Sequence, residues 1–149
     1  MRVKLITAGV LLGLIASVSV LAPTTGAVSA SYFLPAPAGT TLYVTQGNGQ
    51  GDHNATNGSQ YAWDFAVAGS AEFPVVAARG GKVIGLRSDS TNATCRDISC
   101  WTDVNYVLVD HGDGTSALYL HLATGSLKVG LGVTVARTLL NSAGRVANI

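Results

Sequence analysis

Histidine, cysteine and charged residues are scarce in this chain of 149 residues. It contains three histidines and two cysteines, and charged residues make up 11% of it. Lysine and arginine do not cluster anywhere, so the sequence gives no case for nucleic-acid binding. No G-x-S-x-G motif is present, which argues against a serine hydrolase of the nucleophile-elbow type. No helical period is visible after the first 30 residues, which argues against a helical domain.

The first 30 residues have the layout of a secretory signal. Arg2 and Lys4 precede an apolar run over residues 5–21, and small residues follow up to Ala30. The run is short for a membrane span of about 20 apolar residues, so we favour a signal over an uncleaved anchor. We expect cleavage after Ala30, with Ala27 as the second choice. The mature protein is then secreted or held in the cell envelope, without stable membrane association.

The remaining chain has the pattern of an all-β domain built from antiparallel hairpins. Short β-branched and aromatic runs alternate with clusters of Gly, Asn, Asp and Ser, which is typical of strands and turns. The clearest hairpin pairs residues 105–110 with 115–122 around the turn HGDG, and a second hairpin-type turn is expected at Gly80-Gly81. We place the domain at residues 41–149, after a flexible Pro- and Ala-rich lead-in at 31–40.

Alternation along the second arm of the clear hairpin predicts which side chains share a face. Leu118, Leu120 and Leu122 should lie on one face of the strand. Tyr119 and His121 should lie on the other.

The segment YAWDF, residues 61–65, places a carboxylate among aromatic side chains. Alternation predicts that Tyr61, Trp63 and Phe65 share one face and hold the strand against the core. Asp64 then faces the opposite side. A buried carboxylate is costly unless it is paired or binds a metal, so we expect Asp64 to face a site.

Two pairs of residues are candidates for metal or covalent chemistry. His53 and Asp64 are of the types that bind zinc, but their spacing alone is equally compatible with a surface hydrogen bond. Cys95 and Cys100 are expected to form a disulfide in an exported protein. A metal site is the weaker interpretation of the cysteines, because no second Cys or His pair accompanies them.

The region from about Leu34 to Leu140 resembles the lysostaphin-type, or LytM-like, zinc endopeptidases, which cut peptidoglycan. The resemblance lies in four segments that occur in the family's order. These are His53 followed by WDF, then PVVAARGGKVIGL, then NYVLVDHGDGTSALYLHL, and last SLKVGLGVTVARTLL. The third segment is the most specific of the four.

The resemblance implies a fold, a cofactor and roles for single residues. It implies the antiparallel β-fold of these peptidases, called a duplicated hybrid motif, with zinc as cofactor and peptidoglycan stem or cross-bridge peptides as substrate. His53 and Asp64 correspond to the first two zinc ligands, and His121 to the catalytic histidine. His111 corresponds to a turn position that is not a ligand, and we expect it to be an exposed turn residue.

The sequence departs from the family at its C-terminal end. The family's last strand carries an H-x-H motif with the third zinc ligand, and no such motif follows here. A catalytic zinc has three protein ligands, so an incomplete site with two should bind zinc weakly and give little or no activity. Without that strand we expect an unpaired sheet edge.

Three other functions compete with that of a peptidase. A non-catalytic module of the cell envelope, binding a peptide or a partner, is the main alternative. A serine hydrolase using Ser116 and His121 is disfavoured, because residues five apart on a strand project to opposite faces. A glycan-binding domain using Trp63 and Trp101 is disfavoured, because core packing explains these aromatic residues equally well.

Overall fold

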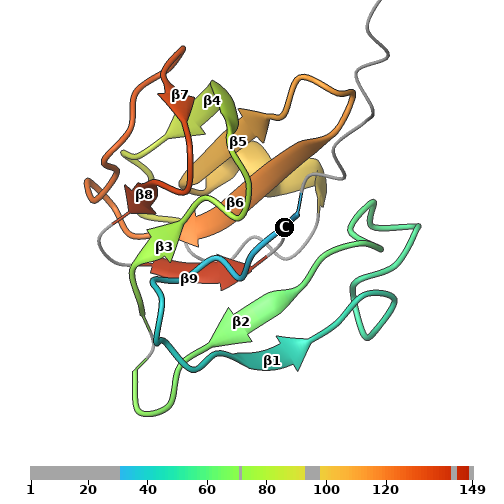
Figure 1. Ribbon diagram of the computed structural model, residues 1–149. Helices are drawn as coiled ribbons and strands as arrows, with labels where there is room; N and C mark the ends of the chain where they lie inside the picture. The colour runs from blue at the N-terminus through green and yellow to red at the C-terminus, as the bar shows by residue number, and fades with distance from the viewer. Residues whose placement is uncertain (1–30, 71, 93–97, 142–143, 148–149) are drawn as a thin grey trace, which may run out of the picture.

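The computed structural model describes residues 31–70, 72–92, 98–141 and 144–147, and these form an all-β domain (Figure 1). Its strands are β1 (Tyr43–Gln46), β2 (Asp64–Ala66), β3 (Val75–Val76), β4 (Gly81–Arg87), β5 (Tyr106–Asp110), β6 (Ser116–Leu122), β7 (Thr134–Val135), β8 (Leu139–Asn141) and β9 (Gly144–Ala147). A 3-10 helix, η1 (Ile98–Asp103), precedes β5. The expected signal, residues 1–30, lies outside the described residues. Within those residues, no helix has the length and apolar character needed to cross a membrane.

Seven strands form one antiparallel sheet in the order β1-β2-β9-β6-β5-β4-β7, and β3 pairs with β8 in a second sheet. The predicted all-β, antiparallel fold is therefore confirmed. The hairpin of β5 and β6 lies where the sequence predicts it. Tyr106 is opposite Leu120 at its open end, and Asp110 is opposite Ser116 beside the turn.

Strand β9 lies between β2 and β6, as Figure 1 shows. Asp64 of β2 is opposite Ala147, and Ala147 is in turn opposite Leu120 of β6. The expected unpaired edge at a missing last strand is therefore not found beside β2, because β9 pairs with both of its neighbours. One row of paired residues across the sheet therefore contains Asp64, Ala147 and Leu120, and Leu120 directly precedes His121.

Strand β6 contains a bulge that changes its alternation. The register shifts between Leu120 and Leu122, and His121 between them has a φ of 58°, a left-handed value that few residues other than glycine adopt. Leu122 packs in the main core with Tyr119, whereas Leu120 packs in a second cluster with Val104. The prediction that the three leucines share one face was wrong for Leu122, because an extra residue reverses the alternation.

Gly80 and Gly81 do not close a hairpin, so that prediction was also wrong. Strand β3 pairs with β8, whereas β4 pairs with β5 and β7. Gly81 is instead a point of close approach between β4 and β5. A Cβ atom there would overlap the carbonyl oxygen of Asp110.

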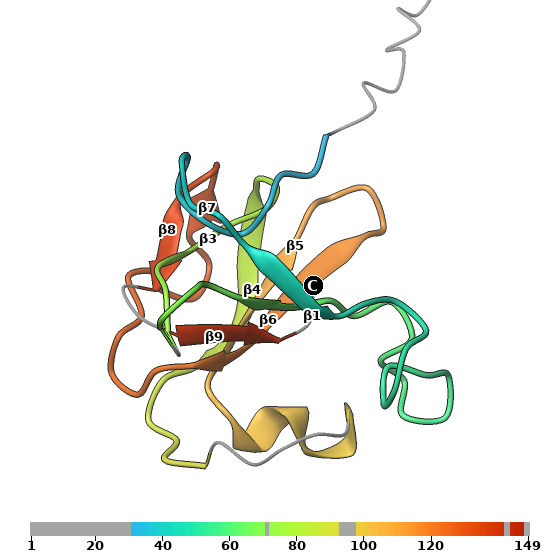
Figure 2. The same cartoon turned by 90° about the horizontal axis from the view of Figure 1, so that it is seen from below.

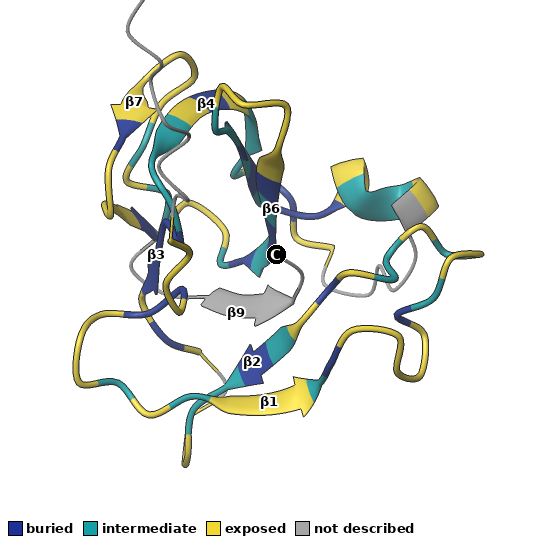
Figure 3. Ribbon diagram, turned by 45° about the vertical axis from the view of Figure 1, so that its right-hand side comes forward, coloured by how far each residue is buried: buried dark blue, intermediate teal, exposed yellow. Residues whose placement is uncertain are grey.

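The main core is lined by buried residues of β3 to β8. The ribbon of buried residues is dark blue in Figure 3. Tyr119 is the largest of the fully buried side chains. Its hydroxyl oxygen accepts a hydrogen bond from the backbone N–H of Ala78 at 2.7 Å. Burial raises the pKa of Tyr119 to about 12, so this hydroxyl stays neutral in the core.

Part of the segment at residues 31–40 packs against the domain. The N–H of Phe33 donates to the carbonyl of Ala78 at 2.9 Å, and the N–H of Val76 donates to the carbonyl of Pro35 at 3.1 Å. Ala36 is 2% exposed and belongs to the main core. These residues, which the sequence places in a flexible lead-in, are therefore held by backbone hydrogen bonds and by burial.

Candidate metal site beside the loop between β1 and β2

The loop at residues 47–63 joins β1 to β2 and extends away from the sheet (Figure 2). The carbonyl oxygen of Asp52 accepts hydrogen bonds from Asn54 N, Asn57 Nδ2 and Ser59 Oγ at 3.0, 2.9 and 3.0 Å. Short polar side chains in turns satisfy backbone groups that no neighbouring strand pairs. The loop thus fixes the backbone next to His53 without regular secondary structure.

His53 is buried, with 5% of its surface exposed, and its ring is oriented by a backbone carbonyl. Its Nδ1 lies 3.2 Å from the carbonyl oxygen of Gly47. A carbonyl oxygen only accepts hydrogen bonds, so Nδ1 carries the proton in the neutral ring. Nε2 is then left with a lone pair, and it lies 3.3 Å from Oδ1 of Asp64.

Asp64 begins β2 and presents a carboxylate oxygen that no described residue satisfies. Its Oδ1 is buried and receives no hydrogen bond of ordinary geometry from the described residues. Burial raises the pKa of Asp64 above its ordinary value of 3.8 and the charge of nearby Asp52 adds to the rise, whereas a protonated His53 opposes it. In the neutral ring and the ionised carboxylate, two lone pairs therefore face each other.

A cation bound between these two atoms would relieve the repulsion, as would a proton on Nε2, which makes the contact an ion pair. Zinc lies about 2.0–2.2 Å from imidazole nitrogen and carboxylate oxygen, so two ligands of a tetrahedral zinc are about 3.4 Å apart. The separation of 3.3 Å between Nε2 and Oδ1 matches that value. The second shell also fits, because a metal-binding imidazole ordinarily donates its other N–H to a carbonyl or carboxylate. Neutral His53 and ionised Asp64 thus suit zinc in donor type, spacing and support.

His121 lies in the neighbouring part of the sheet and does not join this pair in a metal-binding group among the described residues. It follows Leu120, which is two strands away from Asp64 in the same row, or about 10 Å at the usual strand spacing. It is half-buried at the bulge. The structure therefore brings His53 and Asp64 together and places His121 beside the end of their row.

His111 is half-buried rather than the exposed turn residue that the sequence suggests. Its Nδ1 lies 2.8 Å from the carbonyl oxygen of Gly80, and its ring is edge-on to that of Tyr32, with centroids 5.4 Å apart. The turn is folded back onto Gly80, and this buries the ring.

Cys100 lies in η1 and is disulfide-bonded. Cys95 lies outside the described residues, so its pairing with Cys100 stays a prediction.

The aromatic residues before Asp64 do not hold the strand down as the alternation suggests. Tyr61 is 71% and Trp63 is 41% exposed, and only Phe65 is buried in the core. Regular strand structure begins at Asp64, so the two residues before it belong to the loop. Alternation alone could not locate that boundary.

No third His, Cys, Asp or Glu side chain joins His53 and Asp64 in a metal-binding group within the described residues. No family model, no curated protein and no solved structure matches this chain.

Proposed function

We propose that this protein is a secreted relative of the zinc endopeptidases that hydrolyse peptide bonds of peptidoglycan. In this proposal His53 and Asp64 are two ligands of a zinc site, and His121 is the catalytic histidine. The site has two of the three protein ligands that a catalytic zinc requires. We therefore expect weak zinc binding and little activity from the residues described above.

The observation that carries this proposal is the 3.3 Å contact between Nε2 of the buried residue His53 and Oδ1 of Asp64, a buried oxygen without a hydrogen-bond partner among the described residues. With the imidazole neutral, leaving its Nε2 lone pair against a buried carboxylate oxygen is unfavourable. The carbonyl of Gly47 holds the imidazole in the tautomer that exposes Nε2, which is the tautomer a metal requires.

In the proposed reaction, each of these residues has a separate role. His53 and Asp64 bind the ion, and the carbonyl of Gly47 fixes the ring of His53. Zinc held by these residues would act as a Lewis acid toward a substrate carbonyl and would lower the pKa of a coordinated water toward about 7. His121 accepts or returns a proton at its imidazole, the role that histidine fills in general acid–base catalysis.

Calorimetric titration with zinc tests the proposal when it compares the wild type with Ala147→His. Position 147 lies opposite Asp64 in the register of β2 and β9, so a histidine there adds a candidate ligand at the site. We expect weak zinc binding by the wild type, and at least about tenfold tighter binding with cleavage of purified peptidoglycan by the variant. An equal absence of zinc binding in both proteins would contradict the proposal.

A non-catalytic module of the cell envelope is the second candidate. The observation that favours it is that no third ligand joins the pair within the described residues. Such a module would bind peptidoglycan peptides without cleaving them. Binding of a stem peptide that is unchanged by a zinc chelator would support this function over the peptidase.

A further inference from the structure

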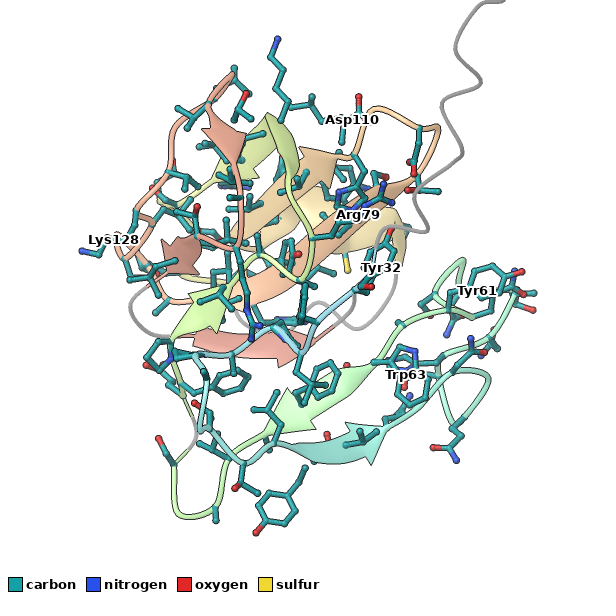
Figure 4. The ribbon with its side chains drawn as sticks, viewed as in Figure 1. Tyr32, Tyr61, Trp63, Arg79, Asp110 and Lys128 are labelled. Atoms are coloured by element: carbon teal, nitrogen blue, oxygen red, sulfur yellow. The ribbon has the colours of Figure 1, made fainter. Side chains whose placement is uncertain are left out.

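Two aromatic side chains stand exposed on the loop that carries His53. Tyr61 is 71% and Trp63 is 41% exposed, whereas Ala62 between them is 5% exposed. The backbone N–H of Ala62 donates to the carbonyl of Ser59 at 2.8 Å, which fixes the segment. Figure 4 shows both aromatic side chains on the loop between β1 and β2. The anchored Ala62 therefore leaves Tyr61 and Trp63 turned toward solvent.

The indole of Trp63 lies close to His53. A Cβ atom on Gly47 would lie 3.3 Å from Cζ3 of Trp63, so the ring lies against the backbone of Gly47. The carbonyl of that same glycine orients His53. One edge of the indole is thus held in place while much of the ring remains open, as in a preformed binding surface.

The loop around the two rings is polar and carries no basic residue. Residues 47–63 contain no Lys or Arg, and the carboxylate of Asp52 accepts a hydrogen bond from Gln46 Nε2. The N–H of Gly49 donates to the carbonyl of Gln60 at 3.0 Å, which brings Asn48 close to Gln60. The amide side chains of Asn48 and Gln60 make no hydrogen bond with any residue that the structure describes. They remain free to bind a ligand.

We propose that Tyr61 and Trp63, with the amides of Asn48 and Gln60, form a carbohydrate-binding surface beside the His53–Asp64 site. A pyranose ring with equatorial substituents has a flat face of C–H groups, which packs on the negative face of an aromatic ring. Its hydroxyl and acetamido groups pair with side-chain amides. A loop without basic residues suits a neutral sugar better than an anionic ligand.

NMR titration of the purified protein with the neutral β-1,4-linked trimer of N-acetylglucosamine tests this proposal. The indole N–H of Trp63 should shift on addition of the sugar. Trp101, whose ring packs edge-on against Tyr106 with centroids 4.6 Å apart, should not shift and serves as an internal control. No shift of Trp63 at sugar concentrations up to about 10 mM would overturn the proposal.

Three variants separate stacking on Trp63 from nonspecific binding to exposed aromatic residues. Trp63→Ala should weaken binding at least about tenfold, and Trp63→Phe, which keeps an aromatic face, should retain most of it. Tyr43→Ala removes an aromatic residue of β1 that is also exposed, at 53%, and should change binding by less than about twofold. Equal losses in Trp63→Ala and Tyr43→Ala would contradict a specific surface.

The proposal does not depend on zinc, and the same titration can show this. Asp64→Asn removes a metal ligand and should leave sugar binding unchanged, so that a failure of the metal site and a failure of the sugar surface remain distinguishable. If the Trp63 resonance shifts with pentaglycine but not with the sugar, the carbohydrate proposal is overturned and the surface binds a peptide instead. A shift that depends on protein concentration without any ligand would overturn it in favour of self-association.

Discussion

His53 and His111 are oriented by the same device and end in different surroundings. Nδ1 of each lies near a glycine carbonyl, 3.2 Å from Gly47 for His53 and 2.8 Å from Gly80 for His111. Nε2 of His53 faces the carboxylate of Asp64 at 3.3 Å, whereas Nε2 of His111 is buried without a hydrogen-bond partner among the described residues. Both rings are held in the same tautomer, but of the two only His53 has a carboxylate oxygen beside its Nε2 atom.

The surroundings of His53 and His111 differ in packing as well as in charge. His111 lies next to the point where β4 and β5 approach closely at Gly81. His53 lies in an extended loop whose glycines include Gly49 and Gly51, both with left-handed φ values. The first region is fixed by strand pairing, and the second by hydrogen bonds among loop residues.

Replacing one glycine in each region should give the largest contrast in stability. Gly81→Ala should lower the free energy of unfolding by at least about 3 kcal/mol, because its Cβ overlaps the backbone oxygen of Asp110 and pairing must shift. Gly49→Ala should cost about 1 kcal/mol, because only its φ of 69° is strained and no atom lies within 4 Å. Urea denaturation of both variants measures the difference, and equal costs would contradict the contrast in packing.

Zinc should distinguish the two histidines. A ligand that binds only the folded state stabilises it by about 2.7 kcal/mol when its concentration is 100 times its Kd. Zinc should therefore raise the Tm of the wild type and of His111→Ala, but not the Tm of His53→Ala. A zinc-dependent rise in Tm that is lost in His111→Ala and kept in His53→Ala would show that the ion binds at His111 instead.

Asp64→Asn should stabilise the metal-free protein at neutral pH. The amide can donate a hydrogen bond to Nε2 of His53, where the carboxylate places a second acceptor. We expect an increase of about 1 kcal/mol in the free energy of unfolding, and loss of the response to zinc. Glu72→Gln, at an exposed carboxylate outside this site, is the control and should change stability by less than about 0.5 kcal/mol. A destabilised Asp64→Asn protein would mean that the two acceptors are not in conflict.

The smallest expected change in stability comes from a substitution near His111. Hydrogen bonds from Thr115 and then from Arg79 hold the pKa of Asp113 well below its ordinary value of 3.8. A lowered folded-state pKa adds stability above pH 3.8, and that stability is lost as the pH falls through the folded-state pKa. Asp113→Asn should thus be slightly less stable than the wild type at pH 7. The difference should shrink in thermal melts at progressively lower pH, and a difference that grows toward acid would contradict the assignment.

The β5–β6 hairpin was predictable from the sequence because period-two alternation and a Gly-containing turn are local signals. The proximity of His53 and Asp64 entered through the resemblance and not through their spacing, since the ten loop residues between them allow many paths. The bulge at His121 has no such local signal, because one inserted residue leaves the composition of the strand unchanged. The exposure of Tyr61 and Trp63 was missed because alternation does not indicate where regular strand structure begins.

The measurement that tests the site most directly is a long-range proton–nitrogen NMR spectrum of the three imidazoles, recorded with and without zinc. We expect His53 to carry its proton on Nδ1 when neutral, and its Nε2 resonance to shift on addition of zinc while that of His111 does not. A metal-free His53 protonated on Nε2 in the neutral form, or an Nε2 resonance that does not respond to zinc, would contradict the proposal that His53 and Asp64 form a cation site.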